Sequence, residues 1–162
     1  MRERDNWIPL YLGLIIFMIY RYKKYALTFI LCAIITAGVS DIVSSRMIKP
    51  GVERLRPCRQ ESMEVTLRAR CGSGFSFTSS HAANHFAVAT FFVLTLGRVW
   101  RWSRPLWLSW AFLISLGQVY VGVHFPFDIL MGSILGVGVG FLGYHLYRNL
   151  YPVPELSGIG RA

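Results

Sequence analysis

Long apolar runs, separated by short polar or basic segments, make up most of this 162-residue chain. A helix that crosses a bilayer needs about 20 predominantly apolar residues. Five runs approach that length when their flanks are counted, and the first is the shortest: 7–20, 25–45, 82–97, 105–123 and 129–147. The pattern predicts a single membrane domain over 1–162, an all-α helical bundle of about five transmembrane helices with one long external loop at about 46–80.

The composition agrees with a membrane protein and argues against other classes. Hydrophobic residues make up 54% of the chain and charged residues only 15%, which lies outside the usual soluble range. A net charge of +9 would suggest nucleic acid in a soluble protein, but basic residues beside membrane helices are typical of topology signals and headgroup contacts. We therefore expect the bilayer as a partner and no nucleic acid. The short first run lacks a small-residue cleavage site, so a removed signal peptide is not expected.

Five crossings would sort the connecting segments onto two faces of the membrane. Segments 21–24 and 98–104 share one face, and segments 46–80 and 124–128 share the other. The first two are short and basic, so the positive-inside rule places them in the cytoplasm. We expect a multi-pass protein of the cell inner membrane, with its long loop facing the periplasm or exterior, its N-terminus outside and its C-terminus inside.

The long external loop is more basic than that rule predicts. Three glutamates accompany seven cations: Arg46, Lys49, Arg54, Arg56, Arg59, Arg68 and Arg70. One explanation is that some of them bind an anion such as phosphate, to which a guanidinium can form two parallel hydrogen bonds. The other is scattered, solvated charge, which we favour for the last three. The loop also holds Cys58 and Cys71, which are either a disulfide pair or two free thiols.

His124 and Asp128 form the pair with the clearest chemical potential. They are four residues apart, so their side chains can meet on one helix face if Pro126 lies in the first turn. The carboxylate would then fix the imidazole tautomer and leave the other ring nitrogen free as a nucleophile. Alternatively, Asp128 is only a favourable charge near a helix N-terminus.

Ser79, Ser80 and His81 directly precede the apolar run at 82–97. Either serine can be the N-cap of a helix there, and a helix start with free amide donors attracts anions. His81 could protonate a leaving alkoxide as a general acid. Capping alone is the simpler interpretation of this triplet.

Together these residues resemble the three-part signature of the type-2 phosphatidic acid phosphatase and vanadium haloperoxidase superfamily. The first part, a lysine, six residues and Arg-Pro, is met by Lys49 and Arg56-Pro57. The second, usually Pro-Ser-Gly-His, is Thr78-Ser79-Ser80-His81 here. The third, Ser-Arg, five residues, His, three residues and Asp, is Gly117-Gln118 followed by His124 and Asp128. The resemblance runs from about residue 41 to residue 140.

This resemblance implies a membrane lipid phosphatase that forms a phosphohistidine and uses neither metal nor other cofactor. His124 would be the nucleophile, Asp128 would orient it and His81 would protonate the leaving group. The implied phosphate-binding residues are Lys49, Arg56, Ser79, Ser80 and Gln118, with Arg54 as a further candidate. The implied substrate is a lipid phosphate or pyrophosphate, such as a carrier-lipid pyrophosphate, a lipid A phosphate or a phosphatidyl phosphate.

Gln118 is the main departure from the family signature, because it replaces an arginine. A charged hydrogen bond contributes roughly 1.5 to 3 kcal/mol, so its loss would slow turnover about tenfold to a hundredfold unless another cation substitutes. We interpret Arg54 as that substitute. A second departure is the helix number, since membrane members of the family commonly have six helices and five runs are visible here.

Two other functions remain open from the sequence. A zinc-dependent membrane hydrolase could use His81 and His85 together with His124 or Asp128 as ligands. This function would leave Lys49, Arg56 and the serines without a role. A catalytically weakened lipid-binding or transport protein would explain Gln118. A haloperoxidase is the least favoured, because those relatives are usually soluble.

Two further features bear on structure rather than chemistry. Asp41, eight residues before Lys49, lies near the predicted external end of its helix, where we expect it to contact a site cation or a backbone amide. The alternative is a solvent-facing helix end. In the last run, Gly132, Gly136 and Gly140 recur every four residues and predict a smooth strip against which another helix packs closely.

Overall fold

The computed structural model of the chain describes residues 12–13, 15–17, 19–20 and 24–150. Half of the residues of the predicted crossing at 7–20 therefore lie outside the described residues. Within 24–150 the regular structure is helical throughout.

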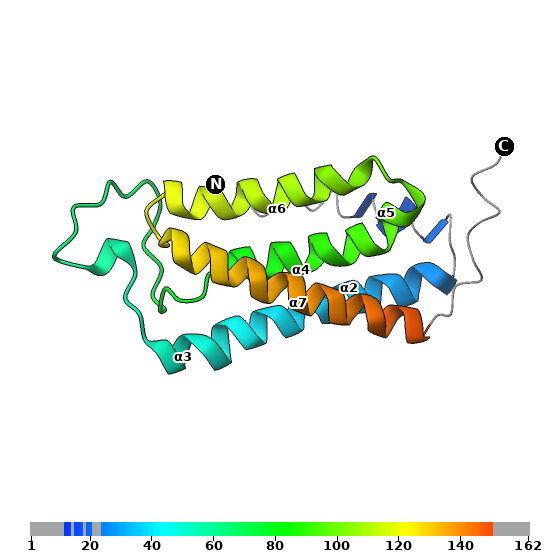
Figure 1. The fold of residues 1–162 in the computed structure, drawn as a ribbon, viewed down its shortest axis with the longest axis horizontal. Helices are drawn as coiled ribbons and strands as arrows, with labels where there is room; N and C mark the ends of the chain where they lie inside the picture. The colour runs from blue at the N-terminus through cyan, green and yellow to red at the C-terminus, as the bar shows by residue number, and fades with distance from the viewer. Residues whose placement is uncertain (1–11, 14, 18, 21–23, 151–162) are drawn as a thin grey trace.

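Four long helices form the bundle and run alternately toward and away from one end (Figure 1). α2 (Lys24–Ile42) continues through a π-helical turn (Val43–Ile48) into the short α3 (Lys49–Val52). A long loop with one 3-10 turn (Pro57–Arg59) leads to α4 (Ser80–Leu94). The chain then passes through α5 (Leu96–Val99) to α6 (Ser103–Tyr120) and α7 (Pro126–Leu150). α4 is central, because it contacts α2, α6 and α7.

The length and hydropathy of these helices identify an all-α membrane protein. Three segments of the described chain are long and apolar enough to cross a bilayer: Ala26–Val52, Ser80–Val99 and Pro126–Leu150. Many large apolar side chains point outward on them, as expected for a surface that faces lipid, among them Leu31, Ile34, Ile134 and Leu142. The prediction of an all-α membrane fold is confirmed.

α6 is the long helix that does not meet these criteria. Its sequence includes Arg104 near its start and Gln118 near its end, which lower the mean hydropathy of its 18 residues. It nevertheless connects the two ends of the bundle, at whose edge it packs mainly against α4 (Figure 1).

The glycine strip on α7 fits against α4, as its four-residue spacing predicted. Gly132, Gly136 and Gly140 face the backbone carbonyls of Ser79, Ala83 and Ala87, and a Cβ atom at any of the three would clash there. The alanines of α4 along this contact are fully buried. Such close approach fixes the first turn of α7 against the first turn of α4.

Candidate active site

The site lies at the end of the bundle where α3 ends, α4 begins, α6 ends and α7 begins, beneath the long loop (Figure 1). Local sequence explains these boundaries. The Ser79 hydroxyl caps α4 by accepting from the Ala82 amide at 3.4 Å. Gly122, with φ of +81°, turns the chain after α6, and Pro126 is the first residue of α7. His124 is thereby held between two helix ends.

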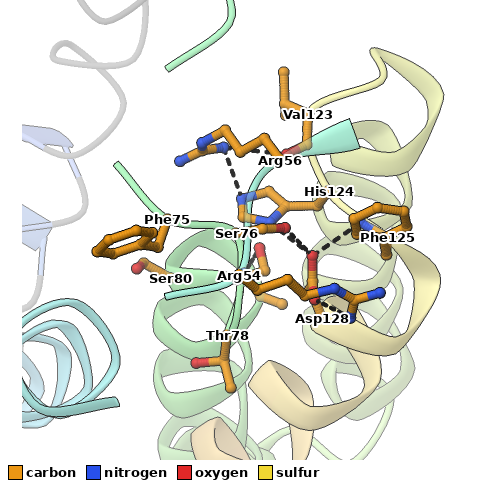
Figure 2. Close-up of polar contacts among 12 residues, drawn as sticks. Arg54, Arg56, Phe75, Ser76, Thr78, Ser80, Val123, His124, Phe125 and Asp128 are labelled. Atoms are coloured by element: carbon orange, nitrogen blue, oxygen red, sulfur yellow. Dashed lines mark hydrogen bonds and ion pairs between the residues drawn. The ribbon is translucent and has the colours of Figure 1, made fainter. Parts of the chain in front are cut away.

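Asp128 is completely buried and both of its carboxylate oxygens have partners (Figure 2). Oδ2 accepts hydrogen bonds from the Ser76 hydroxyl and from the Phe125 amide, the latter at 2.9 Å. Oδ1 accepts from Nη1 of Arg54 at 3.0 Å. The carboxylate is thus held in one orientation by donors from the loop and from its own helix, and its bond to Phe125 shows that it also caps α7.

His124 is buried beside that carboxylate, with 3% of its surface exposed. Its Nδ1 lies 3.5 Å from Oδ2 of Asp128, which is long for a hydrogen bond, but Nδ1 has no nearer partner within the described chain. Its Nε2 lies 3.2 Å from Nη1 of Arg56. Because a guanidinium only donates, Nε2 must carry the lone pair, and the proton of the neutral ring is on Nδ1, facing Asp128.

Burial lowers the pKa of His124 below its usual value of 6.5, and the positive charges of Arg56 and Lys49 act in the same direction. The nearby Asp128 carboxylate opposes the shift without reversing it. The imidazole is therefore neutral at pH 7, which is the form that has a free lone pair on Nε2.

Arg56 is fixed in the site through three of its contacts. Its Nη1 donates to the Val123 carbonyl at 3.2 Å as well as approaching His124, and its Nε donates to the Gly74 carbonyl at 3.0 Å. Burial, and then the charge of Arg59, lower the pKa of its guanidinium, yet an arginine stays protonated at any physiological pH. A fixed positive charge therefore lies directly beside Nε2.

The disulfide between Cys58 and Cys71 supports this placement of Arg56. It joins the two sides of the loop with a Cα separation of 6.2 Å. One residue further along, Gly72 packs so closely against the Arg56 guanidinium that an added Cβ would lie 3.2 Å from its Cζ. The alternative of two free thiols, which the sequence left open, does not describe the structure.

Lys49 is buried and reaches the same loop from the start of α3, directly after the π-helical turn. Its Nζ donates to the carbonyl of Phe75 at 2.9 Å. The ammonium is near enough to Arg56 and Asp128 to interact with both electrostatically. The first and third parts of the signature are thus brought together in space.

The serine and histidine residues of the second part occupy the first turn of α4. Ser79 is buried, and its amide donates to the backbone carbonyl of Asp128 at 3.1 Å. Ser80 shares hydrogen bonds of 2.9 Å with the hydroxyls of Ser44 and Ser45. His81 is exposed, and its ring lies within electrostatic range of His124.

Gln118 and Arg54, both expected at the phosphate, have other contacts in the structure. The backbone carbonyl of Gln118 accepts from the amides of Val123 and His124 at 3.2 and 3.3 Å, while its side chain makes no hydrogen bond to the described residues. Besides binding Asp128, the Arg54 guanidinium lies 4.0 Å from the centre of the Phe125 ring. Arg54 therefore contacts the carboxylate behind His124, on the opposite side of the ring from Arg56 (Figure 2).

Sequence reasoning did not find Ser76 or the Phe75 carbonyl, which hold Asp128 and Lys49. Both lie in an irregular part of the loop, where no spacing pattern marks a residue that contacts a distant helix. The arrangement of zinc ligands considered above is not seen either: no group of three or more His, Cys, Asp or Glu side chains within the described chain is placed to hold a metal ion.

Fold and site together define a class: an all-α, multi-pass membrane protein in which a buried imidazole and carboxylate meet a cluster of cations at the helix ends. The sequence profile of the PAP2 superfamily matches residues 23–152, and the chain belongs to that superfamily.

Several members of known function are similar to the chain. A lipid A 4′-phosphatase of Bacteroides thetaiotaomicron is 31% identical, and the match covers 89% of this chain and 65% of the relative. A second lipid A 4′-phosphatase, of Porphyromonas gingivalis, is 27% identical and is covered over 61% of its length. The chain thus spans less than two thirds of these two relatives.

An undecaprenyl-diphosphatase of Sulfolobus acidocaldarius is 31% identical, with 96% of this chain and 70% of the relative covered. Among solved structures, a transmembrane PAP2-type phosphatidylglycerolphosphate phosphatase from Bacillus subtilis matches with a TM-score of 0.64 at 24% identity. That match covers 90% of this chain and 71% of the other, and it shows that the fold is shared.

Proposed function

We propose that this protein hydrolyses a phosphate or pyrophosphate group on a membrane lipid, with a phosphohistidine at His124 as intermediate. The observation that carries the proposal is the state of the His124 ring. It is buried and neutral, its Nδ1 faces Asp128, and its Nε2 lone pair points at the guanidinium of Arg56. A phosphoryl group that takes the place of the guanidinium at Nε2 would meet this lone pair, as attack by a nucleophile requires.

The reaction follows from these positions. Nε2 of His124 forms a bond to phosphorus while the bond from phosphorus to the leaving oxygen breaks, and His81 gives that oxygen a proton. A water molecule then attacks the phosphohistidine, transferring a proton to His81, and inorganic phosphate leaves as the N–P bond breaks. Asp128 stabilises the positive charge that the ring acquires when Nε2 is bonded to phosphorus.

Lys49 and Arg56, with the hydroxyl and amide groups of Ser79 and Ser80, are the proposed ligands of the phosphate oxygens. Lys49 lies at the start of α3 and Arg56 in the first part of the loop, and both now donate to backbone carbonyls that an anion could replace. The Arg56 guanidinium now occupies the space beside Nε2, so it would turn from Nε2 to the oxygens of a bound phosphoryl group, which would then lie between the nucleophile and the guanidinium. Gln118 and Arg54 remain weaker candidates for this role.

We place the site at the periplasmic or external face of the inner membrane. α2, α4, α6 and α7 each connect the two ends of the bundle, and with the run at 7–20 they give the five crossings that the sequence predicts. The disulfide in the loop favours an oxidising compartment, and the basic segments at the other end favour the cytoplasm. The bilayer would hold the apolar part of the substrate beside the helices.

Release of inorganic phosphate from purified protein tests the proposal. The panel contains an undecaprenyl diphosphate, a lipid A 4′-phosphate and a phosphatidylglycerol phosphate, assayed without added metal. We expect turnover of at least one lipid by the wild type and none by His124→Ala. Turnover that a strong chelator abolishes would instead support the zinc hydrolase, and tight lipid binding without any turnover would support the binding or transport protein.

A further inference from the structure

A hydrogen-bonded polar seam runs from the candidate phosphate site down between α2 and α4. Ser80, beside the cap of α4, is bonded to Ser44 and Ser45 in the π-helical turn, each at 2.9 Å. Ser45 in turn donates to Oδ1 of Asp41 at 3.4 Å, and the same oxygen accepts from Nδ2 of Asn84 at 3.0 Å. The seam thus ends at a carboxylate one helical turn below the serines.

Asp41 is in an unusual place for a carboxylate. It is exposed, and it lies inside the apolar segment Ala26–Val52 between the outward-pointing side chains of Val39 and Ile42. In a bilayer this surface faces lipid, where an ionisable side chain is costly and is therefore a functional candidate. The contact with a cation or backbone amide that the sequence suggested is not the one found, because the donors are a hydroxyl and a side-chain amide.

The end of this seam offers an accessible acceptor that lacks a donor. Both bonds to Asp41 use Oδ1, so Oδ2 of this exposed carboxylate forms no hydrogen bond within the described chain. The Oδ1 oxygen of Asn84 also has no partner there, but it is buried and a ligand does not reach it. A carboxylate oxygen without a donor is unfavourable in an apolar setting, so a ligand that brings an N–H or O–H group would bind favourably at Oδ2 of Asp41.

We infer that Asp41, held by Asn84 and Ser45, forms a subsite that accepts hydrogen bonds from the lipid substrate, and this inference rests on the proposed function. Asp41 precedes Lys49 by eight residues, which include the π-helical turn and correspond to roughly 10 Å along the helix. A substrate with its phosphate at Lys49 and Arg56 would therefore present its donor roughly 10 Å deeper. The substrate class is a phospholipid or glycolipid with amide N–H or hydroxyl groups between its phosphate and its acyl chains.

A polyprenyl diphosphate does not belong to this class. At that depth it has only hydrocarbon, so binding it would cover Oδ2 of Asp41 without supplying a donor. A site that hydrogen-bonds one substrate discriminates against an analogue that lacks the donors, because its own polar groups are then left unpaired. The subsite would thus favour lipids that carry such donors over polyprenyl diphosphates, although the phosphate-binding residues would bind the phosphate of either.

A matched pair of lipids tests this inference in the wild-type protein. One is an acylated glucosamine 4-phosphate with an amide-linked 3-hydroxyacyl chain, and the other has an ester in place of the amide and no hydroxyl on the chain. We expect kcat/KM to be at least about tenfold higher for the first lipid, mainly through a lower KM. Equal kcat/KM values would overturn the subsite while leaving the proposed function intact. Turnover of no lipid phosphate at all would overturn the proposed function itself, and the subsite with it.

Two variants test whether Asp41 accounts for the preference between the two lipids. In Asp41→Asn, which keeps the size of the side chain but replaces Oδ2 or Oδ1 by a donor, we expect the ratio of the two kcat/KM values to fall toward one. In Ile42→Ala, the neighbouring lipid-facing control, we expect the wild-type ratio. A ratio unchanged in Asp41→Asn, whatever its absolute rates, would show that Asp41 does not recognise the donors.

Discussion

The two ends of the bundle are held together by different forces. At the end remote from the site, Phe29 of α2 lies against Phe91 and Phe92 of α4, with ring centroids 5.2 and 5.6 Å apart, and Cys32 is buried beside them. At the site end, buried side chains are polar and are joined by directed hydrogen bonds, as Asp128 shows. Apolar packing constrains shape and volume, whereas a hydrogen-bond network also constrains the identity of each partner.

This difference means that substitutions at the two ends should have separable effects. At the aromatic end a lost contact weakens the folded state without touching the chemistry. At the site end even an isosteric change alters the charge or donor pattern around His124.

Asp128→Asn should have the largest effect on activity. An amide in place of the carboxylate no longer selects the tautomer with the proton on Nδ1 and does not stabilise a positively charged ring. In a comparable His-Asp pair this change lowers kcat about 10⁴-fold, and we expect a fall of about 10³- to 10⁴-fold here. Steady-state phosphate release measures it, with size-exclusion profiles as the control for folding. A fall of less than tenfold would contradict the role given to Asp128.

Phe91→Ala tests the other end. Phe91 is fully buried and contacts Phe29, Phe92 and Tyr147, so truncation should lower the free energy of unfolding by about 3 to 5 kcal/mol. Thermal unfolding in detergent should show a lower Tm, while kcat of the folded fraction, measured well below that Tm, should stay within about threefold of the wild-type value. A large loss of kcat without a change in Tm would show that the two ends are not separable.

Arg54→Ala distinguishes two roles for this arginine. If Arg54 acts by holding Oδ1 of Asp128, its loss should lower kcat about tenfold to a hundredfold with little change in KM, since a charged hydrogen bond contributes roughly 1.5 to 3 kcal/mol. If it binds phosphate in place of the missing family arginine, KM should rise instead. Arg54→Lys is the matched variant and should recover part of kcat. Activity equal to wild type in Arg54→Ala, with activity lost in Lys49→Ala, would exclude both roles.

The change of kcat/KM with pH near neutrality should be smaller than the effects of these substitutions. The reactive form of His124 is neutral, and its pKa lies below 6.5 because the ring is buried. The acidic limb attributable to His124 should therefore begin below pH 6.5, and kcat/KM should fall about tenfold per pH unit once the pH is under the lowered pKa. Because the folded state binds this proton more weakly than the unfolded state, stability is also lost as the pH falls below 6.5. An acidic limb centred above pH 7 would contradict this assignment.

The glycine packing of α7 could be predicted from sequence more fully than the site. Gly132, Gly136 and Gly140 mark a close helix contact by spacing alone, and the i, i+4 relation of His124 and Asp128 follows from helix geometry. The contacts of Ser76 and Arg54 with Asp128 could not be predicted. Both residues lie in an irregular loop that is more than 50 residues from Asp128 in the sequence. Such contacts depend on how the loop folds over the helix ends, and no local pattern encodes that.

The most direct test of the account is detection of the covalent intermediate. Protein rapidly mixed with a lipid substrate labelled with ³²P at its reactive phosphate and quenched in base should carry a label that is stable to alkali and labile to acid, as a phosphohistidine is. The label should map to the peptide containing His124 and be absent from His124→Ala. Undiminished turnover by His124→Ala, with no label on that peptide in the wild type, would contradict the central claim.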